Sequence, residues 1–166
     1  NSSFRSISLR YFNPIGAHPS AVIGESPNGV PDNLIPFICQ SVAGHRDPLT
    51  VFGTDYPTPD GSCVRDYLHV MDLADAHVLA LENLVVGRCR SFNLGTGTGT
   101  SVLEVISSFK GATDLDVPHT LGERREGDIT AIWADSSRAE NELGWKAQRT
   151  ISEALADAWR WQKTLT

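Results

Sequence analysis

Two apolar patterns alternate along the chain. Short runs rich in β-branched and aromatic residues predict strands at 6–12, 49–52, 64–70 and 91–94, with a further short strand near 132–134. Longer runs, in which apolar residues recur every three or four positions, predict helices at 33–43, 72–84 and 136–143, and others that start near 101 and 150. Strands that alternate with helices indicate an α/β domain rather than a sandwich or a helical bundle.

Residues with capping potential stand at the ends of these predicted helices. Asn33, Asp72 and Thr150 each precede an apolar stripe, and their side chains are typical N-caps. Asp75 lies three positions after Asp72, where it suits a capping box. Gly144 follows the helix at 136–143 and is expected to end it.

Two loops interrupt the pattern. A turn at Asn13-Pro14 opens a segment rich in Gly, Pro and Ser that reaches Pro31, and a second loop spans 53–62 with Asp60-Gly61 as its turn signal. Loops as long as the first one, without regular structure, tend to be functional or disordered.

Composition removes several classes of protein. The formal charge of −6, with only three lysines, argues against a nucleic-acid surface, although a few arginines can still bind phosphates. No apolar run approaches the ~20 residues of a membrane span. The three cysteines lie far apart and form neither a metal spacing nor a disulfide framework, so we expect a reducing, cytoplasmic environment.

The glycine-rich turn at 95–99 invites comparison with a dinucleotide-binding loop. It joins a predicted strand to a predicted helix, but the third glycine of G-x-G-x-x-G falls on Thr100. The turn also lies late in the chain rather than in its first βα unit. A tight turn that leads into a helix is therefore the interpretation that we favour.

Other catalytic signatures fail on spacing. The five histidines show no metal-ligand spacing, and His69, inside a predicted strand, is the one considered for a functional role. There is no G-x-S-x-G elbow, and no histidine is placed to activate Cys63. None of the three tyrosines is followed four positions later by lysine, so a Tyr-x-x-x-Lys acid–base pair is also missing.

Two arginines carry more information. Arg65 lies within a strand pattern, and Arg125 precedes a predicted strand in the sequence Arg-Arg-Glu-Gly-Asp. Each could form a structural ion pair with Asp66 or Asp128, or the two together could grip a pyrophosphate bidentately. The carboxylate of Asp128 only accepts hydrogen bonds, so it would suit the two hydroxyls of a ribose.

Several segments together form a recognisable set of motifs. They are Tyr-Phe-Asn-Pro-Ile-Gly-Ala-His-Pro-Ser at 11–20, Pro-Asp-Asn-Leu-Ile-Pro at 31–36, Val-Phe-Gly-Thr-Asp-Tyr at 51–56, Asp-Gly-Ser-Cys-Val-Arg-Asp-Tyr-Leu-His-Val at 60–70, Phe-Asn-Leu-Gly-Thr-Gly at 92–97, Arg-Arg-Glu-Gly-Asp at 124–128 and Trp-Arg-Trp-Gln at 159–162. In this order, and over essentially the whole chain, they resemble the motifs of the UDP-glucose 4-epimerases of the extended short-chain dehydrogenase/reductase superfamily. Asp-Tyr-Pro-Thr-x-Asp-Gly at 55–61 is the most specific part of the resemblance.

The resemblance implies a two-lobed enzyme of which this chain is a part. It would be the smaller C-terminal substrate-binding lobe of a Rossmann-type α/β protein, with the N-terminal Rossmann lobe absent from residues 1–166 and with residues 1–16 as the last strand and turn beside it. The intact enzyme would interconvert UDP-glucose and UDP-galactose by transient oxidation at C4 of the hexose with NAD, and it would form a homodimer. The fragment alone is expected to be inactive.

The resemblance also assigns roles to individual positions. It matches Tyr11, Phe12 and Pro14 to the nicotinamide neighbourhood of the cofactor site. Catalytic residues and metal ligands are expected nowhere in this chain. The positions matched to the UDP-sugar are Asn13, Asn33 and Leu34 near the sugar and pyrophosphate, Thr50 and Phe52 near the uracil, Arg65 and Arg125 at the pyrophosphate, Asp128 at the ribose and Ile132 at the hexose.

Two departures from the family pattern and two alternatives stay open. Ile132 stands where the family has a tyrosine or cysteine, so acceptance of UDP-N-acetylhexosamines is not determined, and the usual Pro-x-Gly-Tyr ending is not present before Thr166. The alternatives are a stand-alone nucleotide-sugar-binding module and a related nucleotide-sugar dehydratase or decarboxylase.

Overall fold

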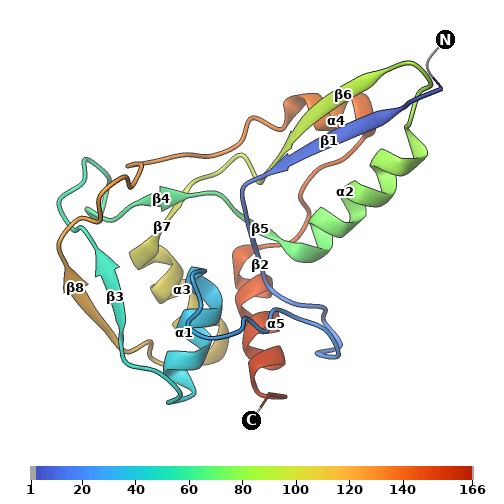
Figure 1. The fold of residues 1–166 in the computed structure, drawn as a ribbon. Helices are drawn as coiled ribbons and strands as arrows, with labels where there is room; N and C mark the ends of the chain where they lie inside the picture. The colour runs from blue at the N-terminus through green and yellow to red at the C-terminus, as the bar shows by residue number, and fades with distance from the viewer. Residues whose placement is uncertain (1–2, 166) are drawn as a thin grey trace.

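The computed structural model describes residues 3–165 and confirms an α/β fold. One end of the molecule is built on β1 (Ser6–Tyr11), which pairs in parallel with β6 (Cys89–Leu94). Helices α2 (Val70–Glu82) and α4 (Ser137–Leu143) pack against this pair, as Figure 1 shows at its upper right. They enclose a cluster of apolar side chains that includes Leu68, Leu73, Phe92, Leu94, Leu143 and Trp145.

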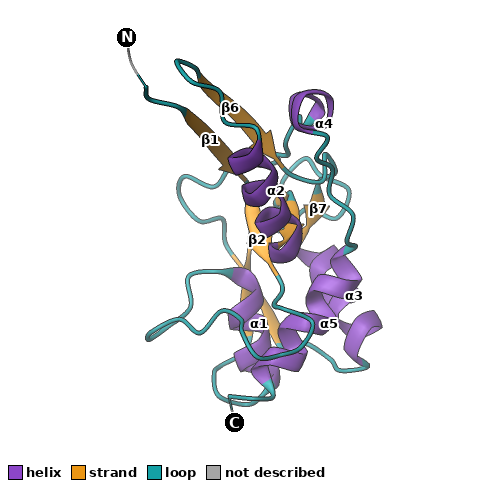
Figure 2. Cartoon of the chain, turned by 90° about the vertical axis from the view of Figure 1, so that its right-hand side faces the viewer, coloured by secondary structure: helices purple, strands orange, loops and turns teal. Residues whose placement is uncertain are grey.

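The other end is helical. Helices α1 (Leu34–Val42), α3 (Val102–Thr113) and α5 (Ile151–Gln162) lie together below the β1–β6 pair in both views (Figures 1 and 2). Their shared core includes Ile38, Val51, Val105, Phe109 and Leu155, all of them less than 2% exposed. The apolar stripes predicted for these helices are thus the faces that they bury.

Three short strand pairs complete the fold. Two of them lie between the two ends: β2 (Asn13–Ile15) with β5 (Tyr67–His69) in parallel, and β4 (Val64–Arg65) with β7 (Thr100–Ser101) antiparallel. The third, β3 (Leu49–Phe52) with β8 (His119–Gly122) in parallel, lies beside the helical end at the lower left of Figure 1. Because each pair has only two strands, these strands rely on the helices packed around them for stability.

Capping boxes fix the start of two helices. The Ser101 hydroxyl accepts the N–H of Glu104, whose carboxylate accepts the N–H of Ser101 in return. Thr150 and Glu153 repeat this arrangement at the start of α5. Gly144 ends α4 in the left-handed conformation, with a φ of 68°. The predicted starts at 101 and 150 and the predicted end at 144 are therefore confirmed.

The predicted cap at Asp72 is wrong. The strand pattern at 64–70 breaks at Asp66, and α2 begins at Val70, so that His69 is the N-cap and its Nδ1 accepts the Met71 N–H. Asp72 lies in the first turn, almost fully buried, where its carboxylate accepts the backbone N–H of Arg149 and an N–H of the Arg149 guanidinium. Pairing with β2 ends the strand earlier than its side-chain pattern suggests.

Two further predictions needed correction. Asn13-Pro14 is not a turn but part of β2. Pro14 has no N–H to donate, but the Asn13 N–H donates to Asp66 O at 3.0 Å and holds this strand in place. The predicted strand at 132–134 is reduced to a single bridge between Val64 and Ala131. Strands β7 and β8 were not predicted.

Candidate functional site

A cleft of about 600 Å³ opens where β2, β3 and β4 meet the start of α1. Ten of the twelve residues that the sequence assigned to cofactor or substrate lie along its wall: Phe12, Asn13, Pro14, Asn33, Leu34, Thr50, Phe52, Arg65, Arg125 and Asp128. They come from five separate stretches of sequence, and the fold brings them to one concave surface. A cleft of this size with a few converging polar groups is typical of a small-molecule site.

Arg65 and Arg125 converge on Asp128 within this cleft. Arg65 Nη2 lies 3.5 Å and Arg125 Nη2 lies 3.0 Å from the same carboxylate oxygen, Asp128 Oδ1. Backbone carbonyls also hold Arg65, because its Nη1 donates to Val64 O at 2.9 Å and to Ile129 O at 2.6 Å. The Arg125 side chain is 63% exposed, and its hydrogen bond with Asp128 raises its pKa above the ordinary arginine value.

The two arginines therefore differ in freedom. Arg65 is fixed on the wall of the cleft, whereas Arg125 projects from the segment after β8 and reaches over the Phe52 ring at 5.6 Å. An anion that enters the cleft would meet two guanidinium groups with one carboxylate between them. Such a pair can hold a phosphate or diphosphate by charge-assisted hydrogen bonds.

Aromatic and amide side chains line the rest of the cleft. Phe52 ends β3 and is 45% exposed, so its ring offers a face to a planar ligand. Asn13 leaves its side chain exposed at the start of β2. Asn33 stands at the N-cap position of α1 but makes no capping hydrogen bond, and its Nδ2 donates to Glu25 Oε1 at 2.7 Å. Asn33 is thus the N-cap residue, as predicted, but the capping hydrogen bond expected of its side chain is not formed.

Tyr11 and Ile132 lie outside the cleft wall. Tyr11 ends β1 and is 49% exposed, with its ring centroid 6.4 Å from that of His77. Ile132 is 37% exposed, and its N–H donates to Val64 O at 3.1 Å. Both residues lie close in sequence to residues that line the cleft, but they are not part of its wall.

Tyr67 is a lining residue that the sequence reasoning missed. It stands two positions after Arg65, on a neighbouring strand, and is 7% exposed. Burial raises the pKa of its phenol to about 12, so the group stays a neutral hydrogen-bond donor. The spacing of two residues was a usable signal, because side chains two apart along a strand face the same side. Cys63, Asp32 and Phe37 are further lining residues without such a signal.

The glycine turn at 95–99 serves the fold. Its Thr96 N–H and Gly97 N–H both donate to the buried carboxylate of Asp66, at 2.9 and 3.1 Å. These N–H groups are already paired and cannot also cradle a pyrophosphate. The interpretation as a tight turn that leads toward a helix is thereby confirmed.

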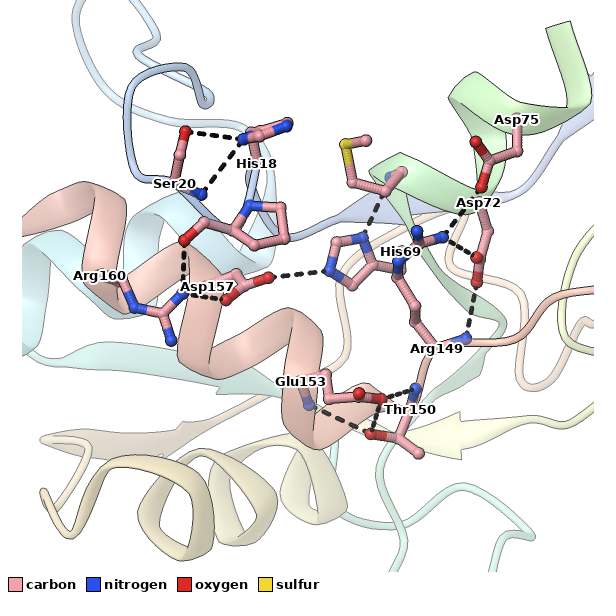
Figure 3. A network of polar contacts seen from close by, with 12 residues as sticks. His18, Ser20, His69, Asp72, Asp75, Arg149, Thr150, Glu153, Asp157 and Arg160 are labelled. Atoms are coloured by element: carbon pink, nitrogen blue, oxygen red, sulfur yellow. Dashed lines mark hydrogen bonds and ion pairs between the residues drawn. The ribbon is translucent and has the colours of Figure 1, made fainter. Parts of the chain in front are cut away.

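His69 belongs to a polar network away from the cleft (Figure 3). Its ring bridges the Met71 N–H and Asp157, whose other oxygen accepts an N–H of Arg160. The residues drawn in Figure 3 join α2, α5 and the loop at Pro19, which is a structural role. Among residues 3–165, no group of histidine, cysteine, aspartate or glutamate side chains is arranged to hold a metal ion.

The chain is similar to known proteins of one family. A sequence model of the NAD dependent epimerase/dehydratase family matches residues 1–95. The UDP-glucose 4-epimerase of Bacillus subtilis (strain 168) is 52% identical over 157 residues, which are 94% of this chain and 46% of that protein. The bifunctional UDP-glucose 4-epimerase and UDP-xylose 4-epimerase 3 of Arabidopsis thaliana is 55% identical over 93% of this chain and 45% of its own length.

Solved structures show the same likeness in three dimensions. The UDP-glucose-4-epimerase from Stenotrophomonas maltophila, with bound NAD and formylated UDP-arabinopyranose, superimposes with a TM-score of 0.94 at 50% identity. It is matched over 98% of this chain and 49% of that one. The enzyme from Bifidobacterium longum, in complex with NAD+ and UDP, gives a TM-score of 0.94 at 46% identity. The chain spans about half the length of the curated relatives that it matches. No helix among the described residues is long and apolar enough to cross a membrane.

Proposed function

The chain belongs to the NAD dependent epimerase/dehydratase family, and from this premise we propose that it is the nucleotide-sugar-binding part of a UDP-glucose 4-epimerase. The intact enzyme interconverts UDP-glucose and UDP-galactose, and this part is its smaller C-terminal lobe together with residues 1–16 beside the NAD lobe. The observation that carries the proposal is the convergence of Arg65, Arg125 and Asp128 at one cleft that also presents Phe52. Each of these residues has the chemistry that one portion of a UDP-sugar requires.

The pyrophosphate is the portion with the strongest complementarity. Arg65 and Arg125 share Asp128 Oδ1 as acceptor. A diphosphate offers several anionic oxygens, so both guanidinium groups gain acceptors on binding while Asp128 is released to take the hydroxyls of the ribose. The diphosphate and the ribose are thus bound by Arg65, Arg125 and Asp128, and each arginine lies within hydrogen-bonding reach of the aspartate.

The uracil and the hexose occupy the two ends of the cleft in this proposal. The exposed face of Phe52 packs against the base beside Thr50, and Asn13, Asn33 and Leu34 lie toward the sugar and pyrophosphate. Ile132 borders the hexose end and has no polar atom in its side chain, so it contributes shape and no hydrogen bond. Acceptance of an N-acetyl group therefore depends on the space beside Ile132.

The described residues fit one end of an NAD molecule and not the whole of it. Tyr11 ends β1, and Phe12 and Pro14 follow it, so all three lie at the carboxyl end of the parallel β1–β6 pair, which is where ligands bind in open α/β sheets. At the glycine turn, the N–H groups of Thr96 and Gly97 already donate to Asp66, so they are not available to the pyrophosphate of a dinucleotide. When bound, NAD supplies the oxidation and reduction at C4 of the hexose. The part played by this chain is to bind the UDP-sugar and hold the hexose toward the cofactor.

The remaining polypeptide is the partner that this proposal requires. Within residues 3–165, β1 pairs only with β6, so its outer edge is open to a further strand. Val78 and Leu81, one turn apart on α2, are exposed, as are Val85 and Val86 just after it. An open parallel edge beside an exposed apolar surface suits the packing of a second lobe. A homodimer and a cytoplasmic location belong to the same proposal, the latter supported by three free cysteines.

A coupled assay on the intact protein tests the proposed function. We expect turnover of UDP-galactose to UDP-glucose, with UDP-N-acetylgalactosamine measured beside it to define the hexose end. The 166-residue chain with added NAD should give no turnover, because the acid–base pair is not among its residues. An intact protein that binds UDP without converting UDP-galactose would favour a nucleotide-sugar-binding module or a dehydratase or decarboxylase instead.

A further inference from the structure

We propose that Asp66, which lies outside the cleft, is the positioning residue that sets the geometry of the UDP-binding cleft. Asp66 stands between β4 and β5, with Arg65 on one side and Tyr67 on the other, and it is 0% exposed. Both neighbours line the cleft, whereas Asp66 does not. Because side chains alternate along an extended chain, Asp66 points away from the ligand while its neighbours point toward it. This inference rests on the proposed function of the cleft.

The carboxylate of Asp66 accepts four hydrogen bonds. Oδ1 accepts the Thr96 N–H at 2.9 Å and the Thr96 hydroxyl at 2.7 Å, and Oδ2 accepts the N–H groups of Gly97 and Ala134, both at 3.1 Å. Three of these donors are backbone N–H groups, which can only donate, so both oxygens must act as acceptors. A buried carboxylate that accepts four hydrogen bonds is fully satisfied without a basic partner, and the loss of any donor leaves one of its acceptor positions without a hydrogen bond.

These hydrogen bonds tie together the segments that carry the cleft residues. Through Ala134, Asp66 holds the end of the segment that includes Asp128, and that segment also pairs with Val64 through the Thr130 carbonyl and the Ile132 N–H. Through its own carbonyl, Asp66 accepts the N–H of Asn13. Asp66 is therefore bonded to the segments that carry Asn13 and Asp128, and it is adjacent in sequence to Arg65.

Gly95 shows how closely the parts are fitted around Asp66. A Cβ at position 95 would lie 2.3 Å from Asp66 Oδ2 and 2.6 Å from the Ala134 Cβ. Only a glycine lets the turn approach the carboxylate and the segment at 134 together. This contact explains the glycine at 95 without a cofactor.

Three variants of the intact protein test the proposal. Asp66→Asn keeps the size of the side chain but places an amide N–H against backbone N–H donors. Thr96→Val removes the hydroxyl, which donates to Asp66 and also hydrogen-bonds with the backbone of Thr98, at an exposed position where the Thr96 N–H to Asp66 remains. Thr98→Val is the matched control, because it lies on the same turn and its side chain is not among the donors to Asp66 within residues 3–165.

The readouts are the dissociation constant of UDP by calorimetry, the KM and kcat for UDP-galactose, and the melting temperature. For Asp66→Asn we expect UDP binding to weaken by about tenfold or more, because displacement of Arg65 or Asp128 costs the ligand a hydrogen bond to a charged group, which is worth about that factor. For Thr96→Val we expect a smaller loss of affinity, with KM raised and kcat nearly unchanged, and for Thr98→Val wild-type values. If Asp66→Asn does not fold, Thr96→Val decides the question.

Two outcomes overturn the inference. If the folded variants have lower melting temperatures but wild-type affinity for UDP, Asp66 is only structural and the proposed function of the cleft stands. If the wild-type protein does not bind UDP at all, the proposed function fails and the inference fails with it.

Discussion

His69 Nε2 lies 3.4 Å from Asp157 Oδ2, and this buried pair joins residues that are 88 positions apart. Because His69 Nδ1 accepts the Met71 N–H, the proton of the neutral ring is on Nε2, from which it is donated to Asp157. Arg160 contacts the other oxygen of Asp157 and also donates to Pro19 O at 2.8 Å. The start of α2, the middle of α5 and the long loop after β2 are thus held at one point (Figure 3).

We predict that His69→Ala destabilises the intact protein by about 3 kcal/mol, because it opens a cavity and removes the partner of the Met71 N–H and of Asp157 Oδ2. Denaturant unfolding followed by circular dichroism measures this change. His45→Ala, at an exposed histidine, should change stability by less than about 0.5 kcal/mol. Equal effects of the two variants would show that the buried pair contributes nothing specific.

Asp60 links stability to pH. Burial acts to raise the pKa of its carboxyl, but hydrogen bonds from the Ser101 hydroxyl and from the N–H and hydroxyl of Ser62 outweigh it, and the pKa is lowered from 3.8. A lowered folded-state pKa stabilises the protein above the unfolded value, and this contribution is lost as the pH falls through the folded value. The stabilisation is therefore complete at neutral pH.

We predict that Asp60→Asn costs about 1–2 kcal/mol at neutral pH, because the amide can accept at one oxygen only. The difference from the wild type should stay constant down to about pH 5 and shrink below about pH 4. Urea unfolding between pH 3 and pH 7 measures it. A difference that grows as the pH falls would contradict the assigned direction.

Substitution by alanine is expected to change stability in opposite directions at Gly24 and at Gly111. A Cβ on Gly24 would lie 2.4 Å from the Trp161 ring, whose Nε1 also donates to Glu25 O at 2.9 Å, whereas a Cβ on Gly111 would meet nothing within 4 Å. Gly24→Ala should therefore lower stability by about 1–3 kcal/mol and speed proteolysis of the loop at 16–33. Gly111→Ala, within α3, should raise stability by about 0.5–1 kcal/mol. The same sign for both changes would refute the packing of the loop on Trp161.

Particular residues show where sequence reasoning reaches its limit. The capping potential of Ser101 and Thr150 is local, so their helices were predicted correctly. His69 took the role expected of Asp72 because the end of β5 is set by pairing with β2, a contact between segments more than fifty residues apart. Strand β8 has no apolar alternation, and only its pairing with β3 makes it a strand.

The candidate site divides in the same way. Residue types and motif order were enough to name ten residues that line one cleft. The sharing of Asp128 between Arg65 and Arg125 depends on positions 63 residues apart, and no local pattern predicts it. Tyr11 and Ile132 were named from motif position alone, and the wall of the cleft does not include them.

The most direct test of the account is the dissociation constant of UDP for the intact protein, measured by calorimetry in the wild type and in Arg65→Ala. Arg138→Ala serves as the control, since it removes the same charge from an exposed arginine that pairs with Glu142 on α4. If the cleft binds UDP, Arg65→Ala should weaken binding at least tenfold, through loss of a charge-assisted contact worth about 1.5–3 kcal/mol, and Arg138→Ala should leave it unchanged. Unchanged affinity in Arg65→Ala would contradict the assignment of this cleft as the UDP site.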